Sequence, residues 1–474
     1  MSAFSALNTA ASALYAQQRA IDVTGQNVAN VNTDGYSRQR VDMQSIGGSV
    51  VPAIWSVSNQ VGQGVNADQV TRIRDAFLEA RAQTEHATTA SLTVQNDTLT
   101  QVEQAFQEPG TTGIQSMLSK MWSGWSDIAN APQDPGARAQ LLQRTQTLIG
   151  GMHSVSKALD GQWSNTRDSL QTLLTDVNAT AKSVADLNQA IKRATQSNMP
   201  SNELQDKRDL LVLHLSEKVG ATSTPAGDGT LSVTVGGVTL VAGNTSLQLR
   251  LSGTNNSADV STDRPTIVTA PGNTPVQVGG TADGQLSTLT TLVPAYQDQL
   301  NAIARQLATQ VNGAHAAGYD LSGTPGEPMF DDGSGNLPVD LTTITAGNIN
   351  LRITDPAKLA AAGLDPTAAG GSPSADANNA DLLYQQRLNG TGTDITYRKM
   401  IVAMGVQSAT ASSNLGTQSV VSSQVDSARD SVAGVSIDEE MTNMLQFQHG
   451  YQAAGRLVST ISSMLDDLMN MVGR

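Results

Sequence analysis

The sequence contains no cysteine and few aromatic residues. Among 474 residues, Phe, Trp and Tyr together make up 3%. Disulfides, thiolate nucleophiles and cysteine-based zinc sites are therefore excluded. Because aromatics are scarce and glycines number 42, buried cores should be thin and the surface large. This composition favours an elongated, multidomain molecule over a compact enzyme.

Positive charge and long apolar runs are also scarce. Lys and Arg number 28 against 42 Asp and Glu, which gives a formal charge of −14. No basic face is evident, so nucleic acid is not an expected partner. No apolar run approaches the ~18 residues that a membrane-spanning helix needs, and the N-terminus lacks the pattern of a secretory signal. We expect no membrane insertion, and export without a cleaved signal peptide if the protein leaves the cell.

The residue patterns of enzymes and cofactor sites are missing as well. Five histidines are scattered without metal-ligand spacing. Gly62-Gln63-Gly64 lacks the strand and helix that flank a dinucleotide loop, and the segment 331–336 lacks the other ligands of a calcium loop. Glu439 and Glu440 are adjacent on a predicted helix and point in different directions, so they are poor glycosidase candidates. The sequence predicts no catalytic, cofactor or metal site, and no enzyme.

The clearest pattern lies at the two ends of the chain. The last predicted helix carries an apolar seam with a 3.5-residue period at Met444, Phe447, Tyr451, Ala454, Val458, Ile461, Leu465, Leu468 and Val472. The first carries a thinner seam at Phe4, Leu7, Ala11, Leu14, Gln18, Ile21, Gly25 and Val28. Such seams are typical of coiled coils, although an apolar stripe is most often the core side of an ordinary helix.

The two seams have two possible arrangements. They could pair as a coiled coil within one chain. They could also order only between subunits, because a lone helix gains too little to offset its ordering entropy. The sequence favours the second arrangement.

Composition changes several times between the two ends. Long helical stretches are interrupted at proline and glycine, and a Thr/Val/Gly-rich segment contains the alternating run Leu231–Val235, followed by a Gly236-Gly237 hairpin turn. The sequence predicts a mainly α protein with β insertions. Its expected parts are a discontinuous terminal helical domain with an α-helical coiled coil (1–70 and 433–474), a helical bundle domain (71–219, 285–317 and 379–432), a small all-β insert (220–284) and an irregular or β segment (318–378).

Several motifs resemble those of one family. The run from Ala20 to Val41, which ends in Gly35-Tyr36-Ser37-Arg38 and Gln39-Arg40-Val41, resembles the N-terminal signature of flagellar axial proteins. The run from Ile437 to Leu468 is similar to the other end of these proteins, and the stretches 204–209 and 311–321 agree. Gly-Tyr-Ser-Arg is similar to family members at the junction of hook and filament, whereas rod and hook proteins more usually carry Gly-Phe-Lys. The segment 220–284 matches no family motif.

The resemblance implies an extracellular structural subunit of the bacterial flagellum that joins hook to filament. It would be exported unfolded through the type III apparatus and would form a tubular helical layer. The implied partners are hook protein, hook-associated protein 3, copies of itself and an export chaperone. The expected assembly interface comprises Leu7, Leu14, Ile21, Val28, Asn30, Asn32, Gly35, Tyr36, Arg38, Phe447, Tyr451, Val458, Ile461, Leu465 and Leu468. The expected chaperone-binding residues are Phe447, Tyr451, Val458, Ile461 and Leu465.

Three alternatives remain open. The first is a hook or rod protein of the same axial family. The second is a secreted enzyme, such as a peptidoglycan hydrolase carried on an axial scaffold. The third is an adhesin that uses the β insert.

Overall fold

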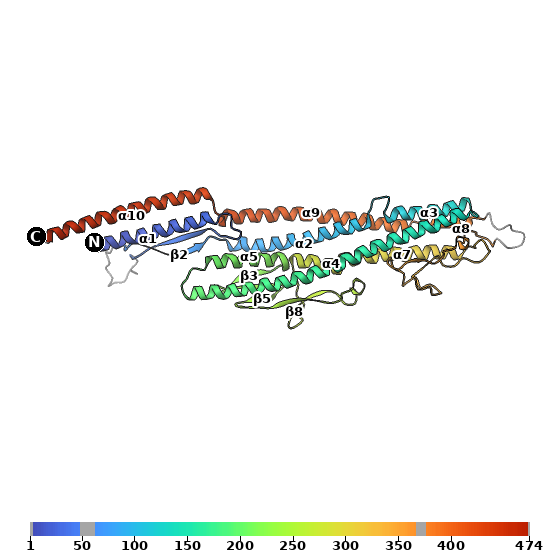
Figure 1. The fold of residues 1–474 in the computed structure, drawn as a ribbon, viewed down its shortest axis with the longest axis horizontal. Helices are drawn as coiled ribbons and strands as arrows, with labels where there is room; N and C mark the ends of the chain where they lie inside the picture. The colour runs from blue at the N-terminus through green and yellow to red at the C-terminus, as the bar shows by residue number, and fades with distance from the viewer. Residues whose placement is uncertain (1–2, 48–61, 366–375, 473–474) are drawn as a thin grey trace, which may run out of the picture. The chain divides into compact units, whose positions relative to one another are not determined.

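The computed structural model describes residues 3–47, 62–365 and 376–472. The fold is mainly α with small antiparallel sheets, as the sequence predicts (Figure 1). Two compact units are present. The first comprises Met1–Thr88, Val177–Gln248 and Gln418–Arg474, and the second comprises Thr89–Asp176 and Leu249–Thr417. The four-part domain division expected from the sequence stays a prediction.

Prolines and glycines end the helices where the sequence indicates. The helices are α1 (Ala3–Ala29), α2 (Ala76–Phe106), α3 (Ile114–Asn130), α4 (Pro135–Gln196), α5 (Asn202–Val219), α6 (Gly280–Ser287), α7 (Val293–Ala316), α8 (Asn378–Gln385), α9 (Thr393–Ala433) and α10 (Ile437–Val472). Pro135 occupies the first helical position of α4, where its missing N–H costs nothing. No helix among the described residues is long and apolar enough to cross a membrane.

Four short strands form a sheet in the first unit. They are β3 (Thr222–Pro225), β4 (Leu231–Val235), β5 (Val238–Ala242) and β6 (Thr245–Ser246), paired antiparallel in this order. Gly236 and Gly237 form the predicted hairpin turn, and both have positive φ angles, which glycine adopts without strain. Val233 and Val235 are buried, so one face of the sheet packs on the protein.

The same unit contains a hairpin of β1 (Gln39–Ser45) and β2 (Val65–Arg72), which packs on α1. Val41 and Ala67 of this hairpin are buried against Ala16 and Ala20 of α1. Small side chains on α1 let the helix approach the strands closely. This contact fixes the first helix on the rest of the unit.

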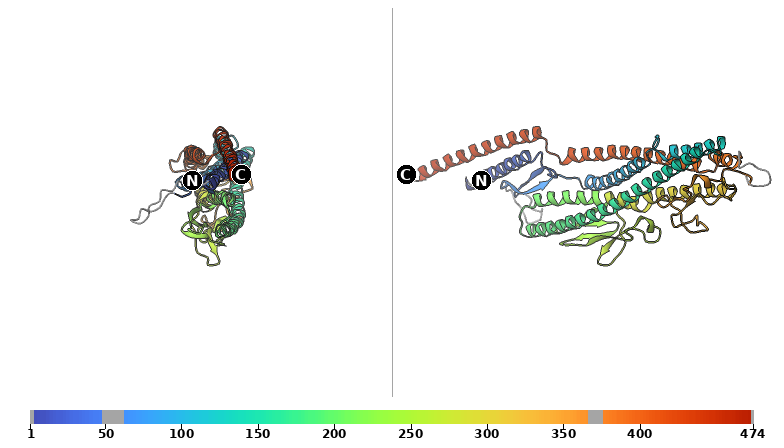
Figure 2. Two further views of the ribbon diagram at one scale, coloured as in Figure 1. Left: turned by 90° about the vertical axis from the view of Figure 1, so that its left-hand side faces the viewer. Right: turned by 45° about the vertical axis from the view of Figure 1, so that its right-hand side comes forward.

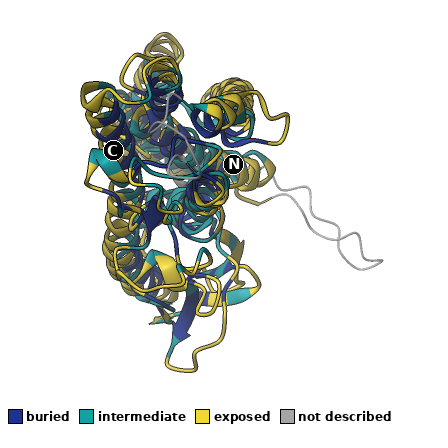
Figure 3. Cartoon of the chain, turned by 90° about the vertical axis from the view of Figure 1, so that its right-hand side faces the viewer, coloured by how far each residue is buried: buried dark blue, intermediate teal, exposed yellow. Residues whose placement is uncertain are grey.

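Aromatic residues, although few, concentrate in the core of the second unit. Trp122 and Trp125 of α3, Trp163 of α4 and Tyr397 of α9 are fully buried. The ring of Phe106 lies 6.5 Å from that of Tyr397. Figure 3 shows how buried and exposed faces alternate around the helices. These fully buried aromatic residues thus support the core of the second unit, whereas Tyr15 and Phe77 of the first unit are exposed.

The second unit also holds short β and 3₁₀ elements. Strands β7 (Gln248–Ser252) and β8 (Thr266–Ala270) pair, as do β9 (Phe330–Asp331) and β10 (Asn350–Leu351). His315 of α7 connects two loops there, because its Nδ1 lies 2.6 Å from the Glu327 carbonyl and its Nε2 accepts from the Ala360 N–H. Burial lowers the pKa of His315 to about 4, so the ring stays neutral.

Candidate functional site: the paired terminal helices

Helices α1 and α10 pack side by side within the chain (Figures 1 and 2). Ala454 and Ile461 of α10 are buried, and Phe447, Val458 and Leu465 are half-buried. The interpretation that the seams pair only between subunits is therefore wrong. The physical reason is that α1 is already held on the β1–β2 hairpin, so α10 docks on an ordered surface and not on a free helix.

The contact face of α1 differs in detail from the predicted seam. The deeply buried apolar residues are Ala10, Ala16 and Ala20, whereas the predicted seam residues Leu7, Leu14, Ile21 and Val28 are half-buried. Thr24 and Asn27 are buried as well. Larger side chains at the buried positions would hold α10 and the hairpin away. The apolar part of the buried face of α1 is thus made of alanine, which a search for large apolar residues overlooks.

The predicted seam on α10 is only partly covered. Tyr451 is 42% exposed, and the side chain of Leu468 lies outside the described residues. A Cβ on Gly450 would stand 2.9 Å from the Gln17 side chain, so glycine permits close approach of the two helices. Gly450 therefore serves the packing of α10 on α1.

Buried polar contacts join the two helices at the hairpin end. Asn27 of α1 donates through Nδ2 to the Gln39 carbonyl and to Glu440 Oε2, both at 2.9 Å. Its Oδ1 accepts from the Tyr36 hydroxyl at 2.8 Å and from the Gln39 N–H at 3.0 Å. A buried amide is costly unless its hydrogen bonds are made. Here four are made, and they tie α1, β1 and α10 together.

Arg38 supplies the charge that balances Glu440. The Arg38 Nε donates to Glu440 Oε1 at 2.8 Å, and Nη1 lies 2.8 Å from Glu439 Oε2. Glu440 is only 2% exposed, so removing Arg38 would leave a buried charge with only the Asn27 amide as partner. Burial, followed by nearby Asp206 and Glu440, raises the pKa of Tyr36, so its hydroxyl remains a donor.

The rest of the signature loop is attached to α5. The Ser37 N–H donates to Asp206 Oδ2 at 3.3 Å. Gly35 has φ +76°, and a Cβ there would stand 3.1 Å from Leu210, so the position needs glycine for conformation and for space. Asn30 closes the end of α1 by donating to the Gln26 carbonyl. Asn32 is exposed.

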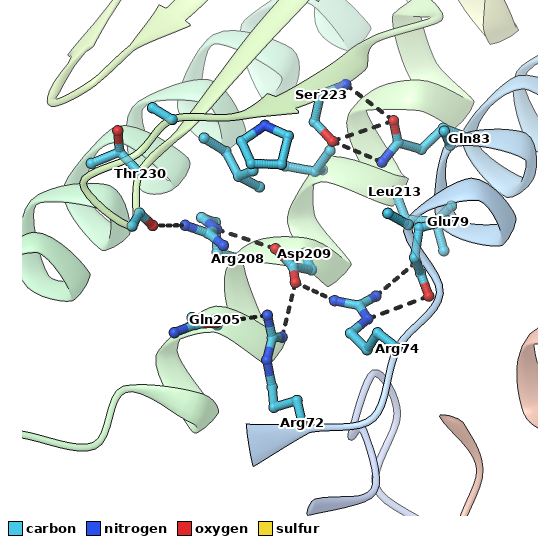
Figure 4. Close-up of a pocket in the computed structure, with 17 residues that line it drawn as sticks. Arg72, Arg74, Glu79, Gln83, Gln205, Arg208, Asp209, Leu213, Ser223 and Thr230 are labelled. Carbon is cyan, nitrogen blue, oxygen red and sulfur yellow. Dashed lines mark hydrogen bonds and ion pairs between the residues drawn. The ribbon is translucent and has the colours of Figure 1, made fainter. Parts of the chain in front are cut away.

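Next to this loop, arginine side chains converge on one carboxylate (Figure 4). Arg72 and Arg74 pair with Asp209, and Arg208 Nε donates to its other oxygen at 3.1 Å. Arg72 also contacts Asp206 at 2.8 Å. These groups line one wall of a cavity of about 360 Å³. Because each guanidinium has an acidic partner, the cluster acts as a joint between β2 and α5.

The ion pairs continue from this joint to α9. Glu79 of α2 pairs with Arg429, which in turn lies 3.4 Å from Asp426. His86 bridges Asp426 and Glu217, each at 3.0 Å. Hydrogen bonds to Glu217 and then Asp426 outweigh burial and raise the pKa of His86 to about 9. The ring is therefore a cation at neutral pH and holds α2, α5 and α9 together.

Comparison with known proteins identifies three matching families. The model described as the flagellar hook-associated protein FlgK helical domain matches residues 99–330. The model of the flagella basal body rod protein matches residues 7–36, and that of the flagellar basal body rod FlgEFG protein C-terminal matches residues 429–471. The two rod models thus fall on α1 with its loop and on α10.

Whole-chain relatives carry one name. Flagellar hook-associated protein 1 of Bacillus subtilis is 29% identical, with 100% of this chain and 99% of that protein covered. The protein of the same name from Salmonella typhimurium is 25% identical, with 98% and 100% covered. The solved structure of the flagellar hook junction protein FlgK from Burkholderia pseudomallei has a similar fold, with a TM-score of 0.61 and 19% identity over 76% of this chain and 100% of that one.

Proposed function

The chain belongs to the flagellar hook-associated protein 1 family, and on this premise we propose that it assembles through its paired terminal helices. It is a structural subunit of the bacterial flagellum at the junction of hook and filament. Its proposed location is extracellular, and its proposed assembled form is a tubular helical layer. Head-to-tail contacts that do not close on themselves generate such tubes.

An uncovered apolar stripe on α10 carries this proposal. Leu457, Met464 and Met471 recur every seven residues and are 49%, 60% and 68% exposed. These positions flank the buried seam of Ala454 and Ile461, because residues three or four apart are neighbours on a helix surface, but they are not covered by α1. Burying each would contribute about 1 kcal/mol, given that full burial of such a side chain is worth about 1.5–3 kcal/mol. Copies of the chain that cover this stripe are the first proposed partner.

Three further partners are proposed. Hook protein and hook-associated protein 3 would contact the two ends of the layer, in keeping with the rod-family models that match both terminal segments. An export chaperone would take the place of α1 on the seam of Phe447, Val458, Ile461 and Leu465 before folding, because an amphipathic helix fits an apolar groove. Tyr451 would extend that surface.

The structure indicates which residues of α10 should be substituted to test assembly. Ile461 packs on α1, so a charge there would break the helix pair within the chain. A double substitution Leu457→Asp and Met464→Asp instead alters residues that are exposed in the chain. We expect an unchanged circular dichroism spectrum but loss of filament growth from hooks and loss of motility. The control is Ser459→Asp with Ser463→Asp, both exposed on the same helix. Normal filaments with the first double variant would refute the proposal.

A rod or hook protein is the second candidate. The rod models match only the terminal segments, whereas the hook-associated helical domain matches the interior. Position along isolated flagella, seen with a labelled antibody, separates the two. The relatives are structural flagellar proteins, which disfavours the enzyme and adhesin alternatives.

A further inference from the structure

Helices α9 and α10 are separated by a tight turn. Only Gly434, Val435 and Ser436 lie between the two helices. The Gly434 N–H donates to the Asp430 carbonyl at 2.9 Å, and a Cβ on Gly434 would stand 2.3 Å from that carbonyl oxygen. Glycine is therefore required here, and the change of direction is built into the backbone. A turn this short still leaves the angle between the helices to be set by contacts.

One residue contacts both sides of the turn. The Arg38 N–H donates to the carbonyl of Ala433, the last residue of α9, at 2.9 Å. The Arg38 guanidinium binds Glu439 and Glu440 in the first turn of α10, each at 2.8 Å. Its main chain thus holds one helix and its side chain holds the other.

Arg38 itself is firmly placed. Its carbonyl accepts from the Ile73 N–H at 2.8 Å, which attaches it to the end of β2. Its partner Glu440 is buried, and the second oxygen of that carboxylate accepts from Asn27. A rotation of α10 about the turn would separate a buried carboxylate from its cation, which is strongly unfavourable.

We propose that Arg38 sets the angle between α9 and α10, and with it the direction in which the terminal helix pair leaves the turn. It is a positioning residue within the chain, in addition to any contact with a neighbouring subunit. The inference goes beyond assembly as such, because it concerns the shape that each subunit has before it meets another.

Distance measurement between spin labels tests this in the purified full-length protein. The chain has no cysteine, so Ser423→Cys on α9 and Ser459→Cys on α10, both exposed, give one defined pair of labels. For the parent we expect one narrow peak in the distribution of distances between the labels. With Arg38→Ala we expect this distribution to become broad or to shift. Arg38→Lys should fall between them, because an ammonium keeps the charge but lacks the rigid planar fork of donors by which a guanidinium holds both carboxylates.

The matched control is Arg40→Ala. Arg40 lies two residues after Arg38, on β1; its side chain is 69% exposed, and it pairs with Asp42 on that strand. This variant should keep the parent's narrow peak. A peak for Arg38→Ala that superimposes on the parent's would overturn the proposal.

A second variant keeps the test decisive if Arg38→Ala loses helicity by circular dichroism. Glu440→Gln keeps the shape of the side chain and an oxygen for Asn27, but removes the charge that Arg38 binds. It should broaden the distance peak in a protein that keeps the parent's helicity. An unchanged peak in Glu440→Gln would also overturn the proposal.

Discussion

The His86 bridge should make the stability of the first unit depend on pH in the alkaline range. The two carboxylates raise its pKa from 6.5 to about 9. A group with a raised pKa in the folded state stabilises fully below its unfolded pKa, and this stabilisation is lost as pH rises through the folded value. The loss should therefore fall between about pH 6.5 and pH 9.

The size of the effect follows from the same shift. The difference corresponds to about 3 kcal/mol at 1.36 kcal/mol per pKa unit. His86 is partly exposed, and Glu217 and Asp426 are 38% and 36% exposed. Solvent screening of such partners reduces the expected contribution to about 1–2 kcal/mol. Glu217, whose pKa the same bridge lowers, loses its stabilisation only in acid and does not affect this window.

Hydrogen exchange measures this contribution locally, on amides of α2 and α5. We expect His86→Gln to reduce protection at pH 6.5 and to have little effect at pH 9.5. His449→Gln is the control, since His449 is exposed on α10. Equal loss of protection at both pH values, or a pKa of His86 below 7 by NMR, would refute the reasoning.

Two further predictions concern buried polar groups. Asn27→Leu leaves Tyr36 and Glu440 without their amide partner and should cost about 2–4 kcal/mol; faster hydrogen exchange in α1 would report it, whereas exposed Asn8→Leu should change little. Trp122→Phe removes a donor to buried Asp394 and should lower the free energy of unfolding of the second unit by about 1–3 kcal/mol, measured as a lower midpoint in urea by near-UV circular dichroism. An unchanged midpoint would mean that this carboxyl group needs no donor.

Local patterns predicted the elements well. The segment 379–432, expected to be helical, contains α8 and α9, and the predicted Gly236-Gly237 turn joins β4 to β5. The conformational preferences of proline and glycine, and the spacing of apolar residues along a helix or strand, depend only on residues that are close in the sequence. They can therefore be recognised from the sequence alone. The arrangement of the strands between 220 and 284 is not evident from the sequence. They form two separate sheets, one of β3 to β6 in the first unit and one of β7 and β8.

The polar part of the site could not be predicted in this way. Glu440 was considered only as an adjacent acidic pair with Glu439, whereas the structure joins it to Asn27 and Arg38. The periodicity of a helix indicates on which face a residue lies. It does not indicate which residue from a distant part of the chain will contact that face. The one available signal was an asparagine in the last turns of an otherwise apolar helix face.

The bond between Asn27 and Glu440 joins residues 413 positions apart in the chain. While the ribosome makes the protein, α1 emerges long before its partner helix. For nearly the whole of synthesis the alanine face of α1 has no α10 to cover it, and contacts of such long range form late. The first unit can therefore close only after α10 has been made, so a chain that stops before α10 lacks the helix pair through which we propose that the protein assembles.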